Sequence, residues 1–500
     1  MLEDETQLAA ESPPLPVGPA LDPCAMTGPR GTFNRVAEML RIAAPTIATM
    51  VSYTVMQFVD GIMVSQIDPP DPVYVAAQGN GSIWAFVPVS FMAGLLGVVN
   101  TYVSQNLGAG TPQKAPAYAW NALWLSALAA VLMLPYAWAI PWIFALPQLN
   151  QEPRLQEMGA VCAQILLYGA VVTMATRALA QFFYGLHRPA VVLWAAIAGN
   201  LTNVAVNYVL IYGQPQWGIE AMGVKGAALG TVVGTTVELI LPAMVFLSAK
   251  YDALYKVRSQ WRPSVAHIKD ILRIGWPAAI MVGNELVCWA IFMTVLAGHF
   301  GTEHSTAGWI VLRYMHLSFM PSVGLSFAVT AMVGRAIGAK DYALASQYAW
   351  TGLGLASVYM VLCAIFFVVF RHSLVGVFVA EGTDPVKAAE IIKIASGLLI
   401  VAAIFQLFDG TGLTLIGALR GAGDTVIPGV VTVIFAWTFI IGLGYGMVIY
   451  APQLKSLGPW IGAATYIILL GIFLLLRWMS GAWKKINLLE TSASRVDTTT

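Results

Sequence analysis

The sequence predicts an all-α polytopic membrane protein, with twelve transmembrane helices in two pseudo-symmetric six-helix lobes around a central cleft. Composition is the first observation: 58% of the 500 residues are hydrophobic and 10% are charged, whereas a soluble domain carries roughly 25% charged residues. The second is the length of the apolar runs, about 20 to 30 residues, which is enough to cross a hydrocarbon layer roughly 30 Å thick. The third is an internal repeat, which predicts the two lobes.

The membrane spans are expected to be helices, because a membrane β-barrel would show alternating segments about ten residues long and runs such as 461–476 do not alternate. Apolar runs and their breakers predict twelve spans, near 35–66, 73–103, 116–146, 156–186, 190–212, 223–249, 265–298, 304–335, 343–371, 387–419, 425–450 and 457–482. Around them we expect a disordered cytoplasmic tail, an amino-terminal lobe, a cytoplasmic linker, a carboxy-terminal lobe and a second cytoplasmic tail, over residues 1–34, 35–249, 250–264, 265–483 and 484–500.

The two halves share short motifs in register. Arg41-Ile42 with Pro45 matches Arg273-Ile274 with Pro277, and Gly108-Ala109 followed by Tyr118-Ala119-Trp120 matches Gly338-Ala339 followed by Tyr348-Ala349-Trp350. Six helices return the chain to its starting side, so the halves have one orientation and are related by an axis along the membrane normal. A cleft between two lobes is the expected result.

Basic residues predict the orientation, because Lys and Arg accumulate on the cytoplasmic side of a membrane protein. Most of them fall on the side of the chain termini, including Arg30, Arg41, Lys114, Arg188, the linker cluster, Arg335, Lys340, Arg420 and Lys484. Both termini are therefore predicted to be cytoplasmic, in a multi-pass protein of the plasma (inner) membrane.

Charge and cysteine content argue against other classes. A net charge of +1 gives no reason to expect nucleic acid as a partner. The four cysteines lie far apart, so neither a disulfide nor a cysteine metal site is predicted. The first thirty residues lack a positive segment followed by an apolar one, so they are not a secretory signal.

Three carboxylates occur at membrane depth, where a charge costs between about 3 and 10 kcal/mol depending on the reference state. They are Asp60 in the first helix, Glu285 in the seventh and Asp409 in the tenth. Each could simply pair with a neighbouring helix. Glu285, however, lies about two turns from the position that matches Asp60, and structural needs shared by both halves would tend to repeat. We therefore interpret the acids as functional.

Amides accompany these acids. Gln57 and Gln406 each precede an acid by one helical turn, and Asn284 directly precedes Glu285. The fifth helix carries Asn200, Asn203 and Asn207 within about 60° on one face, and such a stripe cannot comfortably face lipid. Asparagines can join helices by hydrogen bonds, but carboxylate and amide oxygens together also suit Na⁺, and the acid alone suits a proton. Both interpretations remain open.

Three further charges, Arg177, Glu238 and Arg313, could line the cleft, although Glu238 stands near a predicted helix end, where it could simply reach water. Aromatic rings could attract a cationic substrate, but the sequence does not indicate which of them would do so.

Between Arg35 and Lys485 the chain resembles the multidrug and toxic compound extrusion (MATE) family, on a set of five segments. These are Phe58-Val59-Asp60-Gly61-Ile62-Met63-Val64, Ser104-Gln105-Asn106-Leu107-Gly108-Ala109-Gly110, Asn203 to Gly213, Pro277 to Glu285, and Leu419-Arg420-Gly421-Ala422-Gly423-Asp424-Thr425. The resemblance implies a two-lobe exporter that exchanges drugs, often cationic, for inward-moving Na⁺ or H⁺, with no cofactor and no catalytic residue.

By the same resemblance, Asp60 is the acid of the amino-terminal lobe with Asn203 and Asn207 as its partners, and Glu285 and Asp409 are the acids of the carboxy-terminal lobe. Any of the three acids could ligate Na⁺, and Gln57, Asn200, Asn284 and Gln406 are candidate cleft-lining residues. The presence of both later acids is similar to the NorM-like bacterial branch. The chain departs from the family pattern at Asn284 and in 442–446, so the coupling ion remains open. We expect a monomer in the lipid bilayer.

Two alternative functions use the same kind of membrane protein. A lipid-linked saccharide flippase should carry a cluster of Lys or Arg in its cleft, and only Arg177 and Arg313 are candidates. A polytopic membrane enzyme needs several catalytic side chains at one membrane level, and the six histidines are scattered. A channel would need a repeated pore loop, which the sequence lacks.

Overall fold

A computed structural model of the chain describes residues 32–69, 71–146, 153–377 and 385–489. Within these residues, eleven helices are long and apolar enough to cross a membrane, and counting one bent pair as a single span gives twelve. The predicted all-α polytopic fold is confirmed. Most of the predicted tails, residues 1–31 and 490–500, lies outside the described residues.

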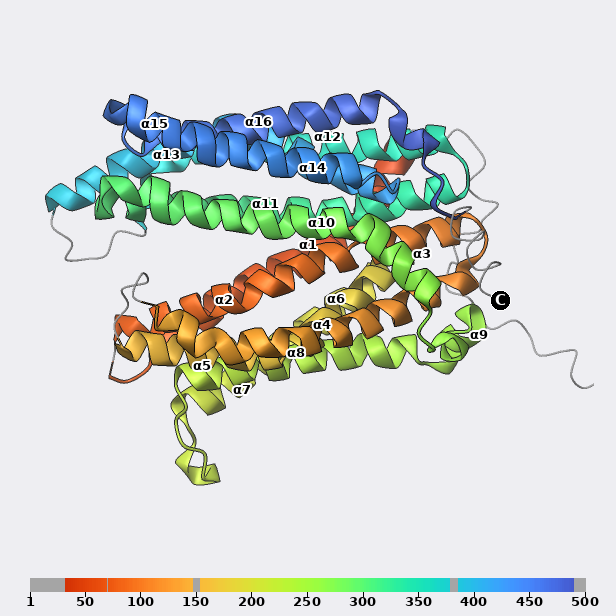
Figure 1. The fold of residues 1–500 in the computed structure, drawn as a ribbon, viewed down its shortest axis with the longest axis horizontal. Helices are drawn as coiled ribbons and strands as arrows, with labels where there is room; N and C mark the ends of the chain where they lie inside the picture. Colours follow the sequence, from red (N-terminus) through yellow and green to blue (C-terminus); the bar gives the residue numbers. More distant parts are fainter. Residues whose placement is uncertain (1–31, 70, 147–152, 378–384, 490–500) are drawn as a thin grey trace, which may run out of the picture.

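Helices of the first half form one lobe, and those of the second half form the other (Figure 1). The first lobe consists of α1 (Thr32–Ser65), α2 (Pro72–Leu96), α3 (Val98–Gly108), α4 (Ala115–Phe144), α5 (Pro153–Tyr168), α6 (Ala170–Gly185), α7 (Pro189–Tyr212) and α8 (Val224–Phe246). The connection between the lobes contains α9 (Ala249–Tyr255) and a 3₁₀ turn, Arg258–Gln260. The second lobe consists of α10 (Val265–Ile291), α11 (Thr302–Gly338), α12 (Tyr342–Gly376), α13 (Pro385–Gly421), α14 (Val426–Phe435), α15 (Gly444–Tyr450) and α16 (Leu457–Met479).

Not every predicted span is a single straight helix. The span predicted at 156–186 is the pair α5 and α6, which bend by 48°. Gly169 lies at this bend, and a Cβ atom there would come within 2.6 Å of Val232 on α8, so the chain bends where it passes close to its neighbour. The span predicted at 73–103 is α2 followed by α3, and it continues to Gly108.

The lobes meet through equivalent helix pairs. α1 packs against α11 and α2 packs against α10, and these pairs correspond because α10 repeats α1 and α11 repeats the α2–α3 segment. We call the side where α1 begins and α16 ends the terminal side. Between the membrane centre and this side, hydrogen bonds join the two lobes: Thr46 to the Gly324 carbonyl at 2.7 Å, Thr101 to the Arg420 carbonyl at 2.8 Å, and Gln105 to the Gly421 carbonyl at 2.9 Å.

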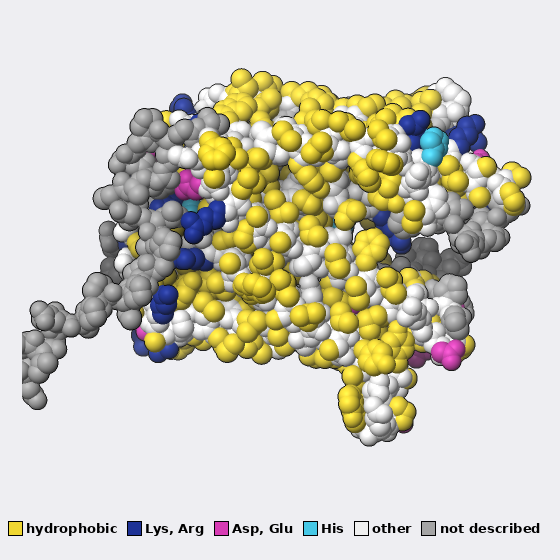
Figure 2. All heavy atoms as spheres, turned by 180° about the vertical axis from the view of Figure 1, so that it is seen from behind, with side chains coloured by type: hydrophobic (Ala, Val, Ile, Leu, Met, Phe, Trp, Pro, Cys, Tyr) yellow, Lys and Arg dark blue, Asp and Glu magenta, His cyan; other side chains and the backbone are white. Residues whose placement is uncertain are grey.

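The other end of the molecule is hollowed between the lobes, as the space-filling view shows (Figure 2). The structure therefore combines a sealed terminal side with an open opposite side. A short segment after α16 adds to the seal: Leu488 is buried against the core of the first lobe and lies over Gly423 of the second. Residues 486–489, which we had expected to be part of a tail, thus pack against both lobes.

Candidate functional site

A stripe of glycines on α8 makes room for the polar face of α7. Gly226, Gly230 and Gly234 are spaced one helical turn apart, and small residues let membrane helices approach closely. A Cβ atom on Gly234 would lie 2.7 Å from the Cβ atom of Asn203, and one on Gly230 would lie 1.9 Å from Oδ1 of Asn207. The glycines thus hold the asparagines of α7 in place at membrane depth.

Asp60 on α1 is the end of a chain of hydrogen bonds that runs through α7. The Asn207 amide donates to Oδ1 of Asp60 at 2.7 Å and to Oδ1 of Asn203 at 3.0 Å. The Asn203 amide donates in turn to the Thr231 hydroxyl on α8 at 3.4 Å. Three of the residues selected from the sequence are thereby brought into direct contact.

A cavity of about 180 Å³ adjoins this chain, between α1, α6, α7 and α8. Four predicted residues line it: Gln57, Asp60, Asn200 and Asn203. The Asn200 amide also donates to the Ser52 carbonyl at 3.2 Å, which ties α7 to α1. Four of the five predicted polar residues of the amino-terminal lobe therefore line one cavity.

The same cavity contains a charged group that the sequence analysis left out of the site. Glu238 accepts a short hydrogen bond from the Tyr53 hydroxyl, and the guanidinium carbon of Arg177 lies 4.9 Å from the centre of the Tyr53 ring. Our interpretation that Glu238 simply reaches water is wrong, because its side chain is buried well inside α8. Its position could have been found from the sequence, because Glu238 continues the four-residue spacing of the α8 glycines.

The acids of the carboxy-terminal lobe also lie together. Oε1 of Glu285 on α10 accepts a hydrogen bond from the Tyr466 hydroxyl on α16 at 3.3 Å. Asp409 on α13 is close enough to Glu285 for their charges to interact. Both carboxylates are partly exposed, as is Asp60. Each lobe therefore holds at least one partly exposed carboxylate on a predicted membrane span.

The remaining candidates are engaged within the second lobe. Asn284 accepts from the Trp437 indole at 2.8 Å, and Gln406 is buried, with its amide 2.5 Å from the Ser318 hydroxyl. Arg313 is exposed on α11. Among the described residues no cluster of three or more His, Cys, Asp or Glu side chains could hold a metal ion, so any cation bound near Asp60 would depend on amide and hydroxyl oxygens as well.

The chain matches known proteins over most of its length. The sequence pattern of the family described as MatE matches residues 45–209 and 277–447. A probable multidrug resistance protein NorM of Pseudomonas syringae pv. tomato is 30% identical over 85% of this chain and 88% of the relative, and one of Pseudomonas putida is 31% identical over 83% and 90%.

The fold has solved counterparts. The crystal structure of a eukaryotic MATE transporter, AtDTX14, superimposes with a TM-score of 0.80 at 17% identity, covering 93% of this chain and all of that one. At this identity the likeness concerns the fold alone. Because the family pattern covers both lobes and the relatives span most of the chain, this protein belongs to the MATE transporter family.

Proposed function

We propose that this protein is a secondary-active antiporter, which exports organic and often cationic small molecules in exchange for Na⁺ or H⁺ by alternating access. It acts as a monomer in the plasma (inner) membrane, with both termini in the cytoplasm and no cofactor. The relatives named above are multidrug resistance proteins of bacteria, which favours drug-like substrates.

One observation carries the proposal. The lobes are joined by hydrogen bonds at the terminal side, while one partly exposed carboxylate of each lobe, Asp60 or Glu285, lies in the half of its span that is nearer the open side. Asp60 is the best-defined of these, because its carboxylate accepts the Asn207 amide beside a polar cavity. A carboxylate surrounded by amide and hydroxyl oxygens suits a hard cation, and the carboxylate alone can bind a proton.

Ion binding must differ between the two states for it to drive transport, because a ligand shifts a conformational equilibrium only by its difference in affinity. The Asp60–Asn207 contact is confined to the amino-terminal lobe, so movement of α1 against α7 would change that affinity. Each net charge moved down 100 mV contributes roughly 2.3 kcal/mol, near a fortyfold substrate gradient. A one-for-one exchange of monocations would use the ion gradient alone.

A lipid-linked saccharide flippase is less well supported. Arg177 is the one cation among the described residues that line the cavity beside Asp60. Its guanidinium lies over the Tyr53 ring, and the Tyr53 hydroxyl donates to Glu238. A pyrophosphate group would require more positive charge than the cavity beside Asp60 supplies.

Transport by reconstituted protein tests the proposal. Ethidium efflux from proteoliposomes is measured under an imposed Na⁺ gradient and, separately, under an imposed pH gradient, for the wild type and for Asp60→Asn, Glu285→Gln and Asp409→Asn. We expect one of the two gradients to drive efflux by the wild type and each substitution to reduce that efflux to near background.

Glu220→Gln is the matched control, because Glu220 is an exposed acid in the loop between α7 and α8, away from both groups of carboxylates. It should transport like the wild type. Efflux that neither gradient accelerates would refute the antiport mechanism, and wild-type rates in all three variants would refute the assignment of the acids.

A further inference from the structure

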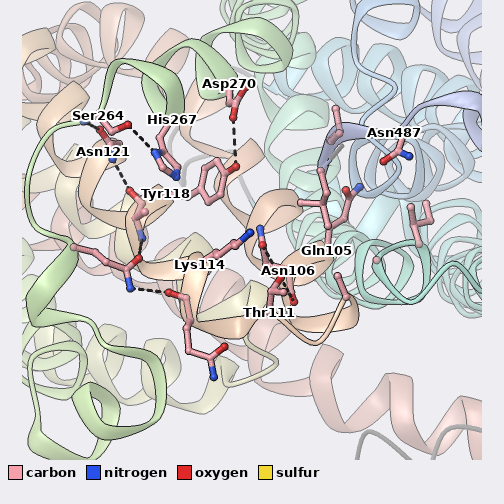
Figure 3. Close-up of a pocket in the computed structure, with 18 of the residues that line it drawn as sticks. Gln105, Asn106, Thr111, Lys114, Tyr118, Asn121, Ser264, His267, Asp270 and Asn487 are labelled. Atoms are coloured by element: carbon pink, nitrogen blue, oxygen red, sulfur yellow. Dashed lines mark hydrogen bonds between the residues drawn. The ribbon is translucent and has the colours of Figure 1, made fainter. Parts of the chain in front are cut away.

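A second and larger cavity, of about 790 Å³, lies at the terminal side between the lobes (Figure 3). Its walls come from the α3–α4 connection, the linker, the start of α10, the α11–α12 turn and residues 486–489. Nothing in the proposed transport site involves it. Its size is within the range of small-molecule sites, about 300 to 1,000 Å³.

Among the described residues, four cations and one acid line this cavity. Lys114, Lys256 and Arg262 belong to the first lobe and the linker, and Lys340 belongs to the second lobe. The acid, Asp270, is buried and accepts the Tyr118 hydroxyl at 3.4 Å. The cavity therefore carries a positive excess to which both lobes contribute.

Two of these lysines have an unusual backbone conformation. Lys256 has φ of 56° and Lys340 has φ of 60°, the left-handed region that usually takes glycine. In the other repeat the position of Lys340 is occupied by Gly110, with φ of 73°. Both lysines cap helix ends, where a left-handed residue is common, so their place at the cavity follows from where α9 and α11 end.

The side chains around the cavity are arranged to receive a ligand. Figure 3 shows Lys114 extending into the cavity toward Asn106, with Tyr118 and His267 on one side and Asn487 on the other. The imidazole of His267 is held by the Ser264 hydroxyl, 2.9 Å from Nδ1, and by edge contact with the Tyr118 ring.

We propose that this cavity is a binding site for a multiply charged, phosphate-bearing small anion, held by Lys114, Lys256 and Arg262 from one lobe and Lys340 from the other. Lysine and arginine bind phosphate by charge-assisted hydrogen bonds. Cations also accumulate on the cytoplasmic face of any membrane protein. That tendency does not explain their convergence on one cavity from both lobes.

Such an anion links the two lobes, because it contacts cations from both. It contacts both lobes only while the terminal side is closed, so it binds that state more tightly and stabilises it. By linkage, conditions that open the terminal side must weaken anion binding by the same factor. This regulatory consequence rests on the proposed alternating access, whereas the site itself does not.

Binding to the purified full-length protein in nanodiscs tests the site. Inorganic pyrophosphate and ATP are the probes, titrated calorimetrically at about 0.15 M salt. We expect both to bind, and we expect Lys114→Gln and Lys340→Asn each to raise the dissociation constant about tenfold. Asparagine is chosen at Lys340 because it tolerates a positive φ.

Lys250→Gln and Lys484→Gln are matched controls, since both are exposed cations near the terminal side that do not line the cavity. Their affinity should equal that of the wild type. Equal weakening in controls and site variants means nonspecific attraction and overturns the proposal, as does the absence of binding by either probe in every lipid composition.

Nanodiscs with and without phosphatidylglycerol distinguish the source of the phosphate. Pyrophosphate binding in both identifies a soluble ligand. Pyrophosphate binding that phosphatidylglycerol abolishes identifies a lipid headgroup in the same site. Ser259 lies in the linker, which packs on α4 of the first lobe, and Ser480 follows α16 of the second lobe. Spin labels at these two positions should report a narrower distance distribution with pyrophosphate. An unchanged distribution with intact binding would refute the linking of the lobes, and it leaves the ethidium experiment unaffected.

Discussion

Gly108 and Gly338, which occupy equivalent positions in the two repeats, lie against each other's helices where α3 crosses α11. A Cβ atom on Gly108 would lie 1.8 Å from the carbonyl oxygen of Arg335, and one on Gly338 would lie 2.0 Å from the carbonyl oxygen of Gln105. The contact is reciprocal, as the axis between the repeats requires. At the terminal side, no other described glycine would bring an added Cβ atom as close to a backbone atom of a neighbouring helix.

Gly338→Ala should therefore shift the protein away from the closed terminal side. The obstacle is a backbone carbonyl, which cannot rotate away, and overpacking of this kind costs about 1 to 3 kcal/mol. That cost changes a conformational equilibrium by roughly 5- to 150-fold. The mean distance between spin labels at Ser259 and Ser480 should lengthen, or the distribution of distances should broaden. Gly354→Ala on α12 is the control, because a Cβ atom there meets no atom within 4 Å. Identical distance distributions in both variants would contradict the prediction.

Gly230→Ala should weaken the binding of the coupling ion without altering any polar side chain. The new methyl group would meet Oδ1 of Asn207, the end of a rotatable side chain, so the fold can accommodate it by turning the amide away from Asp60. Losing a hydrogen bond to a charged group costs about 1.5 to 3 kcal/mol, or more than tenfold in affinity. The ion concentration for half-maximal ethidium efflux measures the effect.

Asn207→Ala should reproduce that change, because it removes the same contact with Asp60. If Gly230→Ala transports with the ion affinity of the wild type while Asn207→Ala does not, then the glycine stripe does not position the amide, and the account of α8 given above is wrong.

The pairing of Asp60 with Asn203 and Asn207 was implied by the resemblance to the MATE family. The residues themselves indicate less: polar groups at membrane depth must find partners, so the acid on one span and the amide stripe on another each needed a partner. The repeat also predicted two lobes, because motifs in register imply equivalent helix packing.

Other features required the crossing geometry itself. Tyr53 joins Glu238 to Arg177 only because α1, α6 and α8 meet at one level, and the spacing of residues along one helix does not contain that information. The bend at Gly169 lies within an apolar run that reads as one span. Burial of Leu488 depends on a surface formed by both lobes, so the local sequence of the tail could not reveal it.

Glu238 and Arg177 should stabilise the protein as a pair. Glu238→Gln keeps an oxygen for the Tyr53 hydroxyl but leaves the charge of Arg177 uncompensated, and Arg177→Gln does the reverse. Breaking a buried pair costs about 3 to 5 kcal/mol, whereas removing both charges is often nearly neutral; the cost here should be smaller because Arg177 is partly exposed. The thermal midpoint of each single variant should fall, and the double variant should recover most of the loss. Additive losses would show that the two charges are independent.

Acid should loosen the terminal side through His187, which precedes α7. Its Nε2 atom lies 3.1 Å from the Ala331 carbonyl on α11 of the other lobe, and its Nδ1 atom is buried without a hydrogen-bond partner. Burial, reinforced by the charge of Arg335, lowers the pKa of His187 to about 4. When the lobes separate and the imidazole meets water, its pKa should return to about 6.5.

The sign of the effect follows from proton uptake. Between pH 6.5 and 4 the open state binds more protons at His187 than the closed state, so the closed state is fully favoured above about pH 6.5 and loses stability as the pH falls, by at most about tenfold per pH unit. The distribution of distances between the Ser259 and Ser480 labels should therefore broaden as the pH falls from 7 to 5. His187→Asn, which tolerates the positive φ of 57° at this position, should remove most of that response. A response of equal size in the variant would assign it to other groups, since Glu38, Arg41, Arg188, Tyr255 and Arg335 line the same pocket.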